Sequence, residues 1–324
     1  MKRVLITGGC GFVGRHFARR LAMKEWQVES VDNLSSGIPF EDWPFKPETE
    51  FYEYDVDDHE YDLREFLVGH DEKYDLVIHC AAVVGGRLKI EGDPLAVATD
   101  LSIDAEFFNW CVKAKPKKII YFSSSAVYPI ELQTRDNHCA LAEQFVHFDC
   151  SRIGRPDMTY GWAKLTGEYL AKQAVEGYGL DVVIFRPFSG YGEDQSFDYP
   201  FPSLIRRVVS GEDPIAIWGS GDQVRDFIHI DDIVECVLQT MNVLKPGEVL
   251  NLGSGESTSF RELVTRAWME LIGDEDSLNV ECDISKPEGV FYRVADTYKM
   301  NQFYRPKVSL EEGIRRVAAH LTKK

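Results

Sequence analysis

The chain has 324 residues, of which 44% are hydrophobic and 27% are charged, so it can bury the core of one large domain or two modest ones. Its formal net charge of −17 argues against binding to nucleic acid, which needs a basic surface, and no apolar run approaches the roughly 18 residues of a membrane helix. The seven scattered cysteines form no CxxC pair and no metal-like grouping with the eight histidines, so we expect reduced thiols, no metal site and a cytoplasmic protein.

Short apolar segments alternate with helical patterns along the first half of the chain. The first of them follows the N-terminal residues so directly that we expect no signal peptide. This alternation predicts an α/β fold, a Rossmann-type doubly wound parallel sheet, which binds ligands at the carboxyl ends of its strands. Strands are expected at 4–8, 28–32, 51–55, 75–82, 119–124 and 181–187, and helices near 12–24, 60–69, 94–114 and 158–176.

The composition changes after residue 187. The segment 188–227 is rich in glycine, proline and tyrosine, and later helical patterns alternate with VLNLGSG (249–255) and short loops. We therefore expect a smaller, discontinuous C-terminal α/β lobe over the edge of the sheet. The predicted division assigns 1–187 and 228–255 to a dinucleotide-binding domain, and 188–227 and 256–324 to a substrate lobe.

The loop TGGCGFVG (7–14) follows the first expected strand and opens the first expected helix. Glycines at such a place let the backbone approach a pyrophosphate, which then lies at a helix N-terminus. Asp32 ends the second strand, where a carboxylate accepts the ribose hydroxyls of NAD and repels the extra phosphate of NADP. The sequence therefore predicts NAD, with an ordinary glycine turn as the alternative. The loop glycines are Gly8, Gly9, Gly11 and Gly14.

The segment TYGWAK (159–164) begins an expected helix, so Tyr160 and Lys164 lie one turn apart on the same face. A tyrosine that accepts a proton near pH 7 must lower its pKa by roughly three units, about 4 kcal/mol. A nearby ammonium and a positive nicotinamide ring could supply this stabilisation together. The alternative is an exposed helix pair without a catalytic role.

The segment IIYFSSSAVYP (119–129) is an apolar strand that ends in three serines. Serine clusters usually mark solvated turns. These serines stand instead at the carboxyl end of a strand, where a parallel sheet binds its ligands. We therefore expect one hydroxyl to contact the substrate oxygen and orient it.

Together these motifs resemble the extended short-chain dehydrogenase/reductases, in particular the nucleotide-sugar epimerase and dehydratase branch. The resemblance covers nearly the whole chain, and five further matches occur in the family's order. They are Asp55–Val56, CAAVVG (80–85), RPFSGYG (186–192), RDFIHIDDIV (225–234) and VAD (294–296).

The resemblance implies a role for each matching position. Tyr160 would be the general base, Lys164 its electrostatic partner and Ser124 the strand hydroxyl, because Ser124 stands three residues before Val127–Tyr128. The implied NAD-binding residues are Gly8, Gly11, Phe12, Val13, Gly14, Asp32, Asn33, Asp55, Val56, Ala81, Ala82, Tyr160, Lys164 and Pro187. The implied residues for a nucleotide-diphosphate sugar are Gly86, Arg87, Ser125, Ser189, Arg225 and Arg293, with Arg225 on the diphosphate.

Two positions after Ser124 separate the reactions of this branch. By the resemblance, 4,6-dehydratases have an Asp-Glu pair at the positions equivalent to Ser125 and Ala126 of this chain. GDP-fucose synthase and GDP-mannose 3,5-epimerase have a cysteine at the position equivalent to Ala126. Since this chain has neither, we expect epimerisation by transient oxidation at C4 of the sugar. The first alternative is a 4-dehydrogenase or reductase that releases the keto sugar, which could be a GDP-sugar because VVGGRLK (83–89) resembles a V-G-G element. A 4,6-dehydratase is a less favoured alternative, and a non-catalytic nucleotide sensor is the last.

The helices expected at 101–115 and after Tyr160 are apolar on two sides each, more than one sheet face requires. The resemblance implies that they form a four-helix interface in a homodimer. The alternative is burial under the C-terminal lobe.

Overall fold

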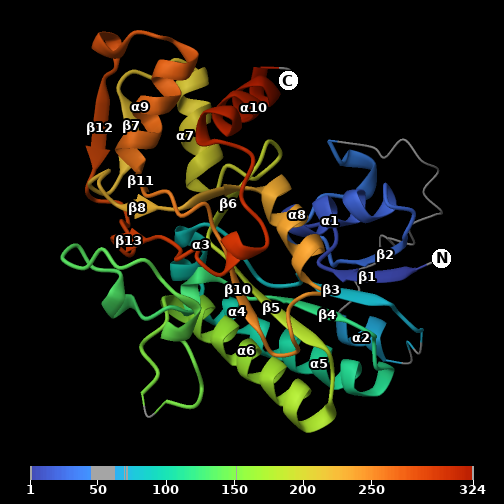
Figure 1. Ribbon diagram of the computed structural model, residues 1–324. Helices are drawn as coiled ribbons and strands as arrows, with labels where there is room; N and C mark the ends of the chain where they lie inside the picture. Colours follow the sequence, from blue (N-terminus) through green and yellow to red (C-terminus); the bar gives the residue numbers. More distant parts are fainter. Residues whose placement is uncertain (1, 45–62, 69, 71, 151, 323–324) are drawn as a thin grey trace.

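A six-stranded parallel sheet forms the centre of the computed structural model, which describes residues 2–44, 63–68, 70, 72–150 and 152–322 (Figure 1). The strand order is β10-β5-β4-β3-β1-β2, so the chain runs outward in both directions from the middle of the sheet, as the doubly wound prediction requires. The strands expected at 4–8, 28–32, 75–82, 119–124 and 181–187 are confirmed, while 51–55 lies outside the described residues. The sheet strands are β1 (Arg3–Thr7), β2 (Gln27–Val31), β3 (Leu76–His79), β4 (Ile119–Phe122), β5 (Val182–Pro187) and β10 (Val249–Leu252).

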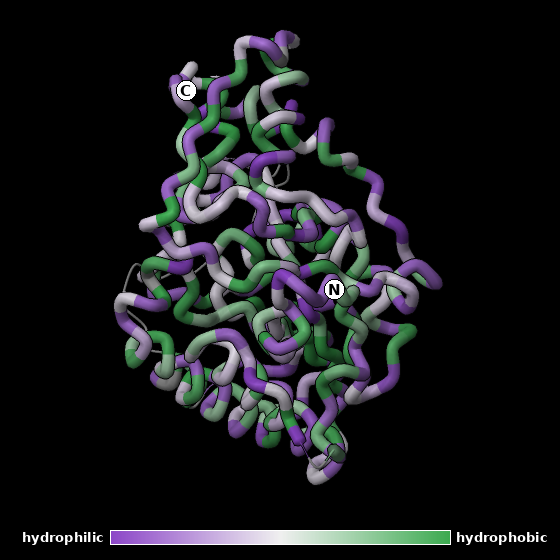
Figure 2. Tube along the Cα trace, turned by 90° about the vertical axis from the view of Figure 1, so that its left-hand side faces the viewer, coloured by the Kyte–Doolittle hydropathy of each residue, from purple (hydrophilic) through white to green (hydrophobic). Residues whose placement is uncertain are grey.

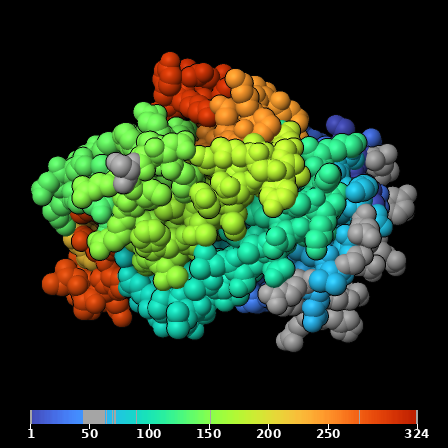
Figure 3. Space-filling model, turned by 90° about the horizontal axis from the view of Figure 1, so that it is seen from below, coloured from blue at the N-terminus to red at the C-terminus, as the bar shows by residue number. Residues whose placement is uncertain are grey.

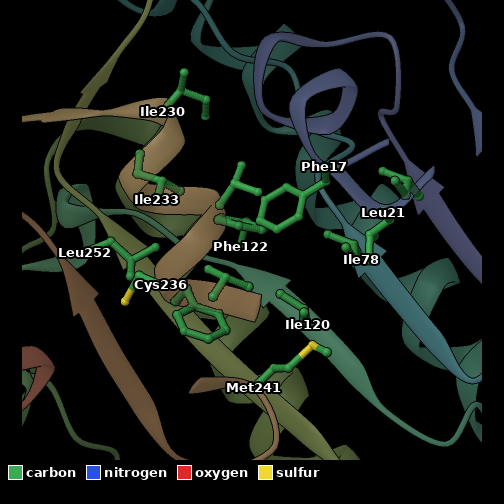
Figure 4. Packing of buried hydrophobic residues seen from close by; sticks show 14 of the residues in the cluster. Phe17, Leu21, Ile78, Ile120, Phe122, Ile230, Ile233, Cys236, Met241 and Leu252 are labelled. Atoms are coloured by element: carbon green, nitrogen blue, oxygen red, sulfur yellow. The ribbon is translucent and has the colours of Figure 1, made fainter. Parts of the chain in front are cut away.

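Alternate residues of each strand enter two separate cores, one on each face of the sheet. In β1, for example, Val4 and Ile6 belong to one core and Leu5 to the other. Figure 4 shows the first core, where Phe17 and Leu21 meet β-strand residues such as Ile120. Helices α1 (Phe12–Ala22) and α8 (Ile230–Thr240) contribute to this core, and α2 (Leu63–Leu67), α5 (Thr99–Ala114) and α6 (Met158–Tyr178) contribute to the other.

The helix expected at 94–114 is divided at Ala98 into α4 (Pro94–Val97) and α5. Asp93 caps α4 by accepting a hydrogen bond from the backbone N–H of Ala96 at 3.0 Å. The much longer α6 ends at Gly179, whose φ of 68° is a conformation that glycine adopts without strain. A further short helix, α3 (Arg87–Gly92), precedes α4.

The C-terminal lobe has a core of its own, formed by residues such as Phe201, Leu263 and Ile314. It lies above the sheet in Figure 1 and forms the narrower upper part of the molecule in Figure 2. Its helices are α7 (Pro200–Val209), α9 (Phe260–Leu271) and α10 (Leu310–Thr322). Its strands are β6 (Ser189–Tyr191), β7 (Ile215–Trp218), β8 (Val224–Arg225), β9 (Phe227–His229), β11 (Thr258–Ser259), β12 (Val280–Asp283) and β13 (Tyr292–Arg293).

The segment between β4 and α6 links the two parts of the molecule. Leu141 in this segment donates its N–H to the carbonyl of Val294 at 2.8 Å and accepts from the N–H of Asp296 at 3.0 Å. Because α8 packs on the sheet and β10 is one of its strands, we retain as a proposal the predicted division into 1–187 with 228–255 and 188–227 with 256–324. Single-turn 3-10 helices lie at Phe40–Asp42, Ser125–Val127, Ile130–Leu132, Glu143–Phe145, Glu275–Ser277 and Met300–Gln302.

Candidate active site

The glycine loop joins β1 to α1 in a conformation that side chains would block. A Cβ on Gly14 would lie 2.2 Å from the carbonyl oxygen of Gly8, and a Cβ on Gly8 would lie 2.6 Å from the backbone nitrogen of Ala81. Gly11 is the N-cap of α1 and offers no side chain to its first N–H groups. The helix N-terminus is therefore open to an anion such as a pyrophosphate.

A cavity of about 1060 Å³ runs from this loop across the carboxyl ends of the strands. It is bounded by three segments that are far apart in sequence: the glycine loop, the end of β4 and the first turns of α6. Every predicted dinucleotide-binding residue that the structure describes lines it, whereas Asp55 and Val56 lie outside the described residues. These lining residues are Gly8, Gly11, Phe12, Val13, Gly14, Asp32, Asn33, Ala81, Ala82, Tyr160, Lys164 and Pro187.

Asp32 lies at the rim of the glycine loop, directly after β2. Its carboxylate accepts hydrogen bonds from the backbone N–H of Cys10 at 3.0 Å and of Leu34 at 2.8 Å, which fixes its orientation. Burial raises the pKa of Asp32, and these backbone donors oppose the rise. The glycine loop, the open N-terminus of α1 and the oriented carboxylate of Asp32 together fit a dinucleotide such as NAD.

Tyr160 and Lys164 project from the first turns of α6 into the cavity that Ser124 also lines. The Lys164 side chain is 2% exposed, and its Nζ lies 5.3 Å from the ring centre of Tyr121 and 6.0 Å from that of Tyr160. Burial raises the pKa of Tyr160, and the charge of Lys164 and the hydroxyl of Ser124 lower it only in part. The chain by itself therefore holds this tyrosine protonated, and a further positive charge is needed before it can act as a base.

Two carboxylates beneath Lys164 were not predicted from the sequence. Asp104 accepts a hydrogen bond from the hydroxyl of Tyr121 at 2.5 Å, and its other oxygen lies 3.1 Å from Nε2 of His79. Burial alone would lower the pKa of Lys164, but Asp104, Tyr160 and Asp100 outweigh it, so the pKa is raised and the ammonium is retained. The two acids are four residues apart on a largely apolar helix, and that spacing was the available signal.

The carboxylate of Asp100 is fully buried, and only one of its two oxygens accepts a hydrogen bond within the described part of the chain. That oxygen accepts from the N–H of Val83 at 2.5 Å, whereas Oδ2 has no hydrogen-bond partner among the residues that the structure describes. Burial raises the pKa of Asp100 to about 6, against the attraction of Lys164. The group is therefore poised to titrate in the physiological range.

The three consecutive serines have different surroundings. The hydroxyl of Ser123 donates to the buried carboxylate of Glu168 at 2.5 Å. Ser124 lines the cavity and accepts a hydrogen bond from the N–H of Ala126 at 3.1 Å. Ser125 is 5% exposed and is not among the residues that line the cavity, so its predicted contact with substrate stays a prediction.

The predicted substrate-binding arginines gather around a single carboxylate. Arg293 Nη2 lies 2.8 Å from Asp157 Oδ2, and Arg87 Nη1 lies 3.5 Å from the same atom. Arg225 is nearby, since a Cβ on Gly289 would lie 2.7 Å from Arg87 Nη1 and 3.3 Å from Arg225 Nη2. Burial, and then the charge of Arg293, lower the pKa of Arg225 to about 9. All three arginines were predicted from the sequence to bind substrate, which stays a prediction, and Asp157, the N-cap residue of α6, was not predicted.

The two other predicted substrate-binding residues lie at close backbone approaches. A Cβ on Gly86 would lie 2.2 Å from the carbonyl oxygen of Asp198, so this position accepts only glycine. Ser189 begins β6 and donates its N–H to the carbonyl of Asp226 at 2.9 Å. Their contacts with substrate stay predictions.

Among the residues that the structure describes, no group of three or more histidine, cysteine and acidic side chains could hold a metal ion. In the same part of the chain, no helix has the length and hydrophobicity to span a bilayer.

Comparisons with known proteins agree with this geometry. The model of the NAD dependent epimerase/dehydratase family matches residues 4–253. A putative UDP-glucose 4-epimerase of Methanocaldococcus jannaschii is 30% identical over 323 residues, 97% of this chain and 96% of that protein. The structures of UDP-glucose 4-epimerase from Thermotoga maritima with UDP-glucose, and of UDP-glucuronic acid 4-epimerase from Bacillus cereus with UDP-glucuronic acid and NAD, match with TM-scores of 0.80 and 0.79. Each is 26% identical and covers 99% of both chains.

Proposed function

Since the chain belongs to the NAD-dependent epimerase/dehydratase family, we propose that it epimerises a nucleotide-diphosphate sugar at C4. The predicted resemblance and the NAD cofactor are confirmed at the level of the family. The observation that carries the proposed reaction is a catalytic set of Ser124, Tyr160 and Lys164 with no carboxylate or thiol at the two positions that follow Ser124.

Each of the three side chains has a distinct task. The Tyr160 oxygen takes the proton of the C4 hydroxyl, and the Ser124 hydroxyl holds the same oxygen in place. Lys164 stabilises the resulting phenolate, because its ammonium is buried beside the ring and retained by Asp104 and Asp100. NAD, when bound, accepts the C4 hydride and adds a positive charge near Tyr160. The C4 epimer would form if the hydride returned to the opposite face of C4 while Tyr160 gave the proton back to the oxygen.

Elimination of water needs a further acid and base, and neither is present next to Ser124. Ser125 and Ala126 follow it, and Ala126 is a buried methyl group that cannot transfer a proton. We therefore expect the keto sugar to be reduced again in this site and not to lose water, which supports epimerisation over dehydration.

We propose UDP as the nucleotide, because the similar proteins above are named for UDP-glucose and UDP-glucuronic acid. The three arginines near Asp157 suit the diphosphate, whose two negative charges require several N–H donors. A neutral hexose and a hexuronic acid remain the two candidate sugars.

Incubation with a panel of nucleotide sugars, followed by proton NMR, tests the proposal. The panel contains UDP-glucose, UDP-glucuronic acid, UDP-N-acetylglucosamine and GDP-mannose. The expected result is a C4 epimer of one UDP-sugar with no net NADH. A stoichiometric ketone with NADH would establish a 4-dehydrogenase instead, and a 4-keto-6-deoxy product would establish a dehydratase.

We also propose a homodimer formed through α5 and α6, which lie side by side on the lower face of the molecule (Figure 3). Phe107, Phe108 and Trp110 of α5 are buried in the chain itself, but Leu101, Trp162 and Tyr169 are 40%, 50% and 46% exposed. The C-terminal lobe therefore does not cover this face, which leaves a partner as the better explanation. The cytoplasmic location stays a prediction.

A further inference from the structure

Asp157 stands where an incoming anion would bind. Its carboxylate is 6% exposed and contacts two guanidinium groups, at 2.8 Å for Arg293 and 3.5 Å for Arg87. Burial alone would raise the pKa of Asp157, but the two arginines outweigh it and hold the pKa below its ordinary value. The group is therefore an anion inside the arginine cluster, present before any substrate arrives.

The backbone of Asp157, and not its side chain, holds the start of α6 in place. Its N–H donates to the carbonyl of Ala126 at 2.9 Å, and its carbonyl accepts from the N–H of Gly161 at 2.9 Å. The carboxylate makes no capping bond to the helix. The side chain can therefore turn away from the arginines without disturbing the first turn, which carries Tyr160.

Arg225 shows that the cluster has capacity for another anion. Its guanidinium donates only to the carbonyl oxygens of Val224, at 2.8 Å, and Glu288, at 3.4 Å, and forms no ion pair within the described part of the chain. The backbone of Gly289 borders the same space, since a Cβ there would lie 2.7 Å from Arg87 Nη1 and 3.3 Å from Arg225 Nη2. Three cations thus share one small region with one internal carboxylate.

Arg87 has a second acidic partner of a different kind. Glu91 lies one turn further along α3, 2.6 Å from Arg87 Nε, and its side chain is 39% exposed. Water screens this pair, whereas the pairs made by Asp157 are largely shielded. Glu91 is therefore the matched control for the effect of Asp157.

We infer that Asp157 is a built-in counter-anion that the diphosphate of the substrate displaces from Arg87 and Arg293, and that it thereby sets the affinity for the nucleotide. The inference rests on the proposed function, because it assumes a diphosphate ligand. A carboxylate and a phosphate compete for the same N–H groups, so every diphosphate that binds must replace these contacts.

Isothermal titration of the full chain with inorganic pyrophosphate and with UDP tests the inference, since neither probe depends on turnover. In Asp157→Asn the competing charge is absent, and the dissociation constants of both probes are expected to fall about tenfold. In Asp157→Glu the longer side chain keeps the charge, reaches further into the cluster and should weaken binding. Glu91→Gln should change either constant less than about threefold.

The opposite pattern would overturn the inference. If Asp157 only holds the arginines in position, Asp157→Asn weakens binding and Asp157→Glu preserves it. Asp157→Glu retains the buried charge, so it remains informative even if Asp157→Asn fails to fold. Turnover of a nucleotide sugar with unchanged pyrophosphate affinity in both variants refutes this inference alone, whereas wild-type protein that neither binds UDP nor converts any sugar of the panel refutes the proposed function.

Discussion

The guanidinium of Arg186 binds the carboxylate of Glu168 through two parallel contacts in the interior, with Nε–Oε1 at 2.8 Å and Nη2–Oε2 at 2.7 Å. Both side chains are 1% exposed. Ser123, which follows β4, donates to the same carboxylate. Glu168 of α6 is therefore bonded both to the end of β4 and to Arg186 near the end of β5. The first of the three serines therefore supports the position of the helix that carries Tyr160.

Replacement of Glu168 by glutamine should destabilise the protein strongly. It leaves the Arg186 charge buried without a counter-charge, which typically costs about 3–5 kcal/mol. Chemical denaturation monitored by circular dichroism measures the change. Glu176→Gln on the exposed side of the same helix is the control, with an expected change within about 0.5 kcal/mol. Equal effects of the two substitutions would contradict the assignment.

The variant Tyr160→Phe should lose turnover while it keeps its cofactor. Removal of the phenolic oxygen removes the proton acceptor, and such losses typically lower kcat by about 10²–10⁴-fold. The NAD content and the melting temperature should stay near those of the wild type, because the ring still fills its place. Tyr169→Phe, at an exposed position of the same helix, should keep full kcat. Wild-type turnover in Tyr160→Phe would support the non-catalytic alternative.

Ser124→Ala and Ser125→Ala should differ, because only Ser124 lines the cavity. Loss of the Ser124 hydroxyl removes one hydrogen bond to the reacting oxygen and should lower kcat by about 10²-fold. Ser125→Ala, in which a buried hydroxyl is removed, should change kcat less than about threefold unless this serine contacts the sugar as the resemblance implied. Steady-state kinetics with the substrate found by NMR measures both. A larger loss in Ser125→Ala would transfer the role to that residue.

Asp100 should make the stability of the protein depend on pH. Its folded-state pKa is about 6, above the ordinary value of 3.8, so the folded protein holds this proton more tightly than the unfolded chain does. The free energy of unfolding should therefore fall between about pH 4 and pH 6, and the loss above pH 6 should be about 3 kcal/mol. Asp100→Asn, which does not ionise, should be more stable than the wild type by this amount at pH 7.

The comparison at low pH is the internal control for Asp100. At pH 4 the carboxyl is protonated in the folded state and about 40% protonated in the unfolded state, so the stabilities of Asp100→Asn and wild type should differ by only about 0.6 kcal/mol. A stability difference that is the same at pH 4 and pH 7 would show that another group causes the pH dependence.

The substitution Trp162→Glu should convert a dimer into a monomer. The indole lies half-exposed on the outer face of α6, and a charge there cannot be buried in an apolar interface without a large cost. Size-exclusion chromatography with light scattering measures the mass, which is 36.9 kDa for one chain. Ile284→Glu is the control, since Ile284 is 84% exposed on the C-terminal lobe. A wild-type protein that elutes as a monomer would rule out the proposed interface.

The parts of the site that could be predicted from sequence depend on local steric rules. Gly14 is required by the close approach of the Gly8 carbonyl, and Gly8 by the close approach of the Ala81 backbone after β3. Asp32 directly follows the last residue of β2. Tyr160 and Lys164 share a helix face by their spacing alone. For this reason every described residue that was predicted to bind the dinucleotide lines the cavity, whereas the six residues predicted to bind the sugar nucleotide lie outside its lining.

The remaining features depend on how distant segments pack. The link from His79 to Asp104 spans 25 residues, and that from Asp157 to Arg293 spans 136. Helical periodicity places Asp100 and Asp104 on one side of α5, but it does not indicate that this side turns toward Lys164. Arg293 in the other lobe likewise donates from Nε to Oε1 of Gln133, in the segment between β4 and α6, at 2.6 Å, and no local pattern encodes this hydrogen bond.

Gly161 has a consequence for how the activity of this protein could be redirected. A Cβ at this position would lie 2.4 Å from the carbonyl oxygen of Ala126, so the first turn of α6 rests directly on the segment that follows β4. The backbone that carries Asp157, Tyr160 and Lys164 is therefore held in one position by this close packing. A library aimed at new sugars should leave α6 unvaried and randomise the surrounding loops near 83–85 and 188–199, where changes can reshape the pocket without moving the proton acceptor.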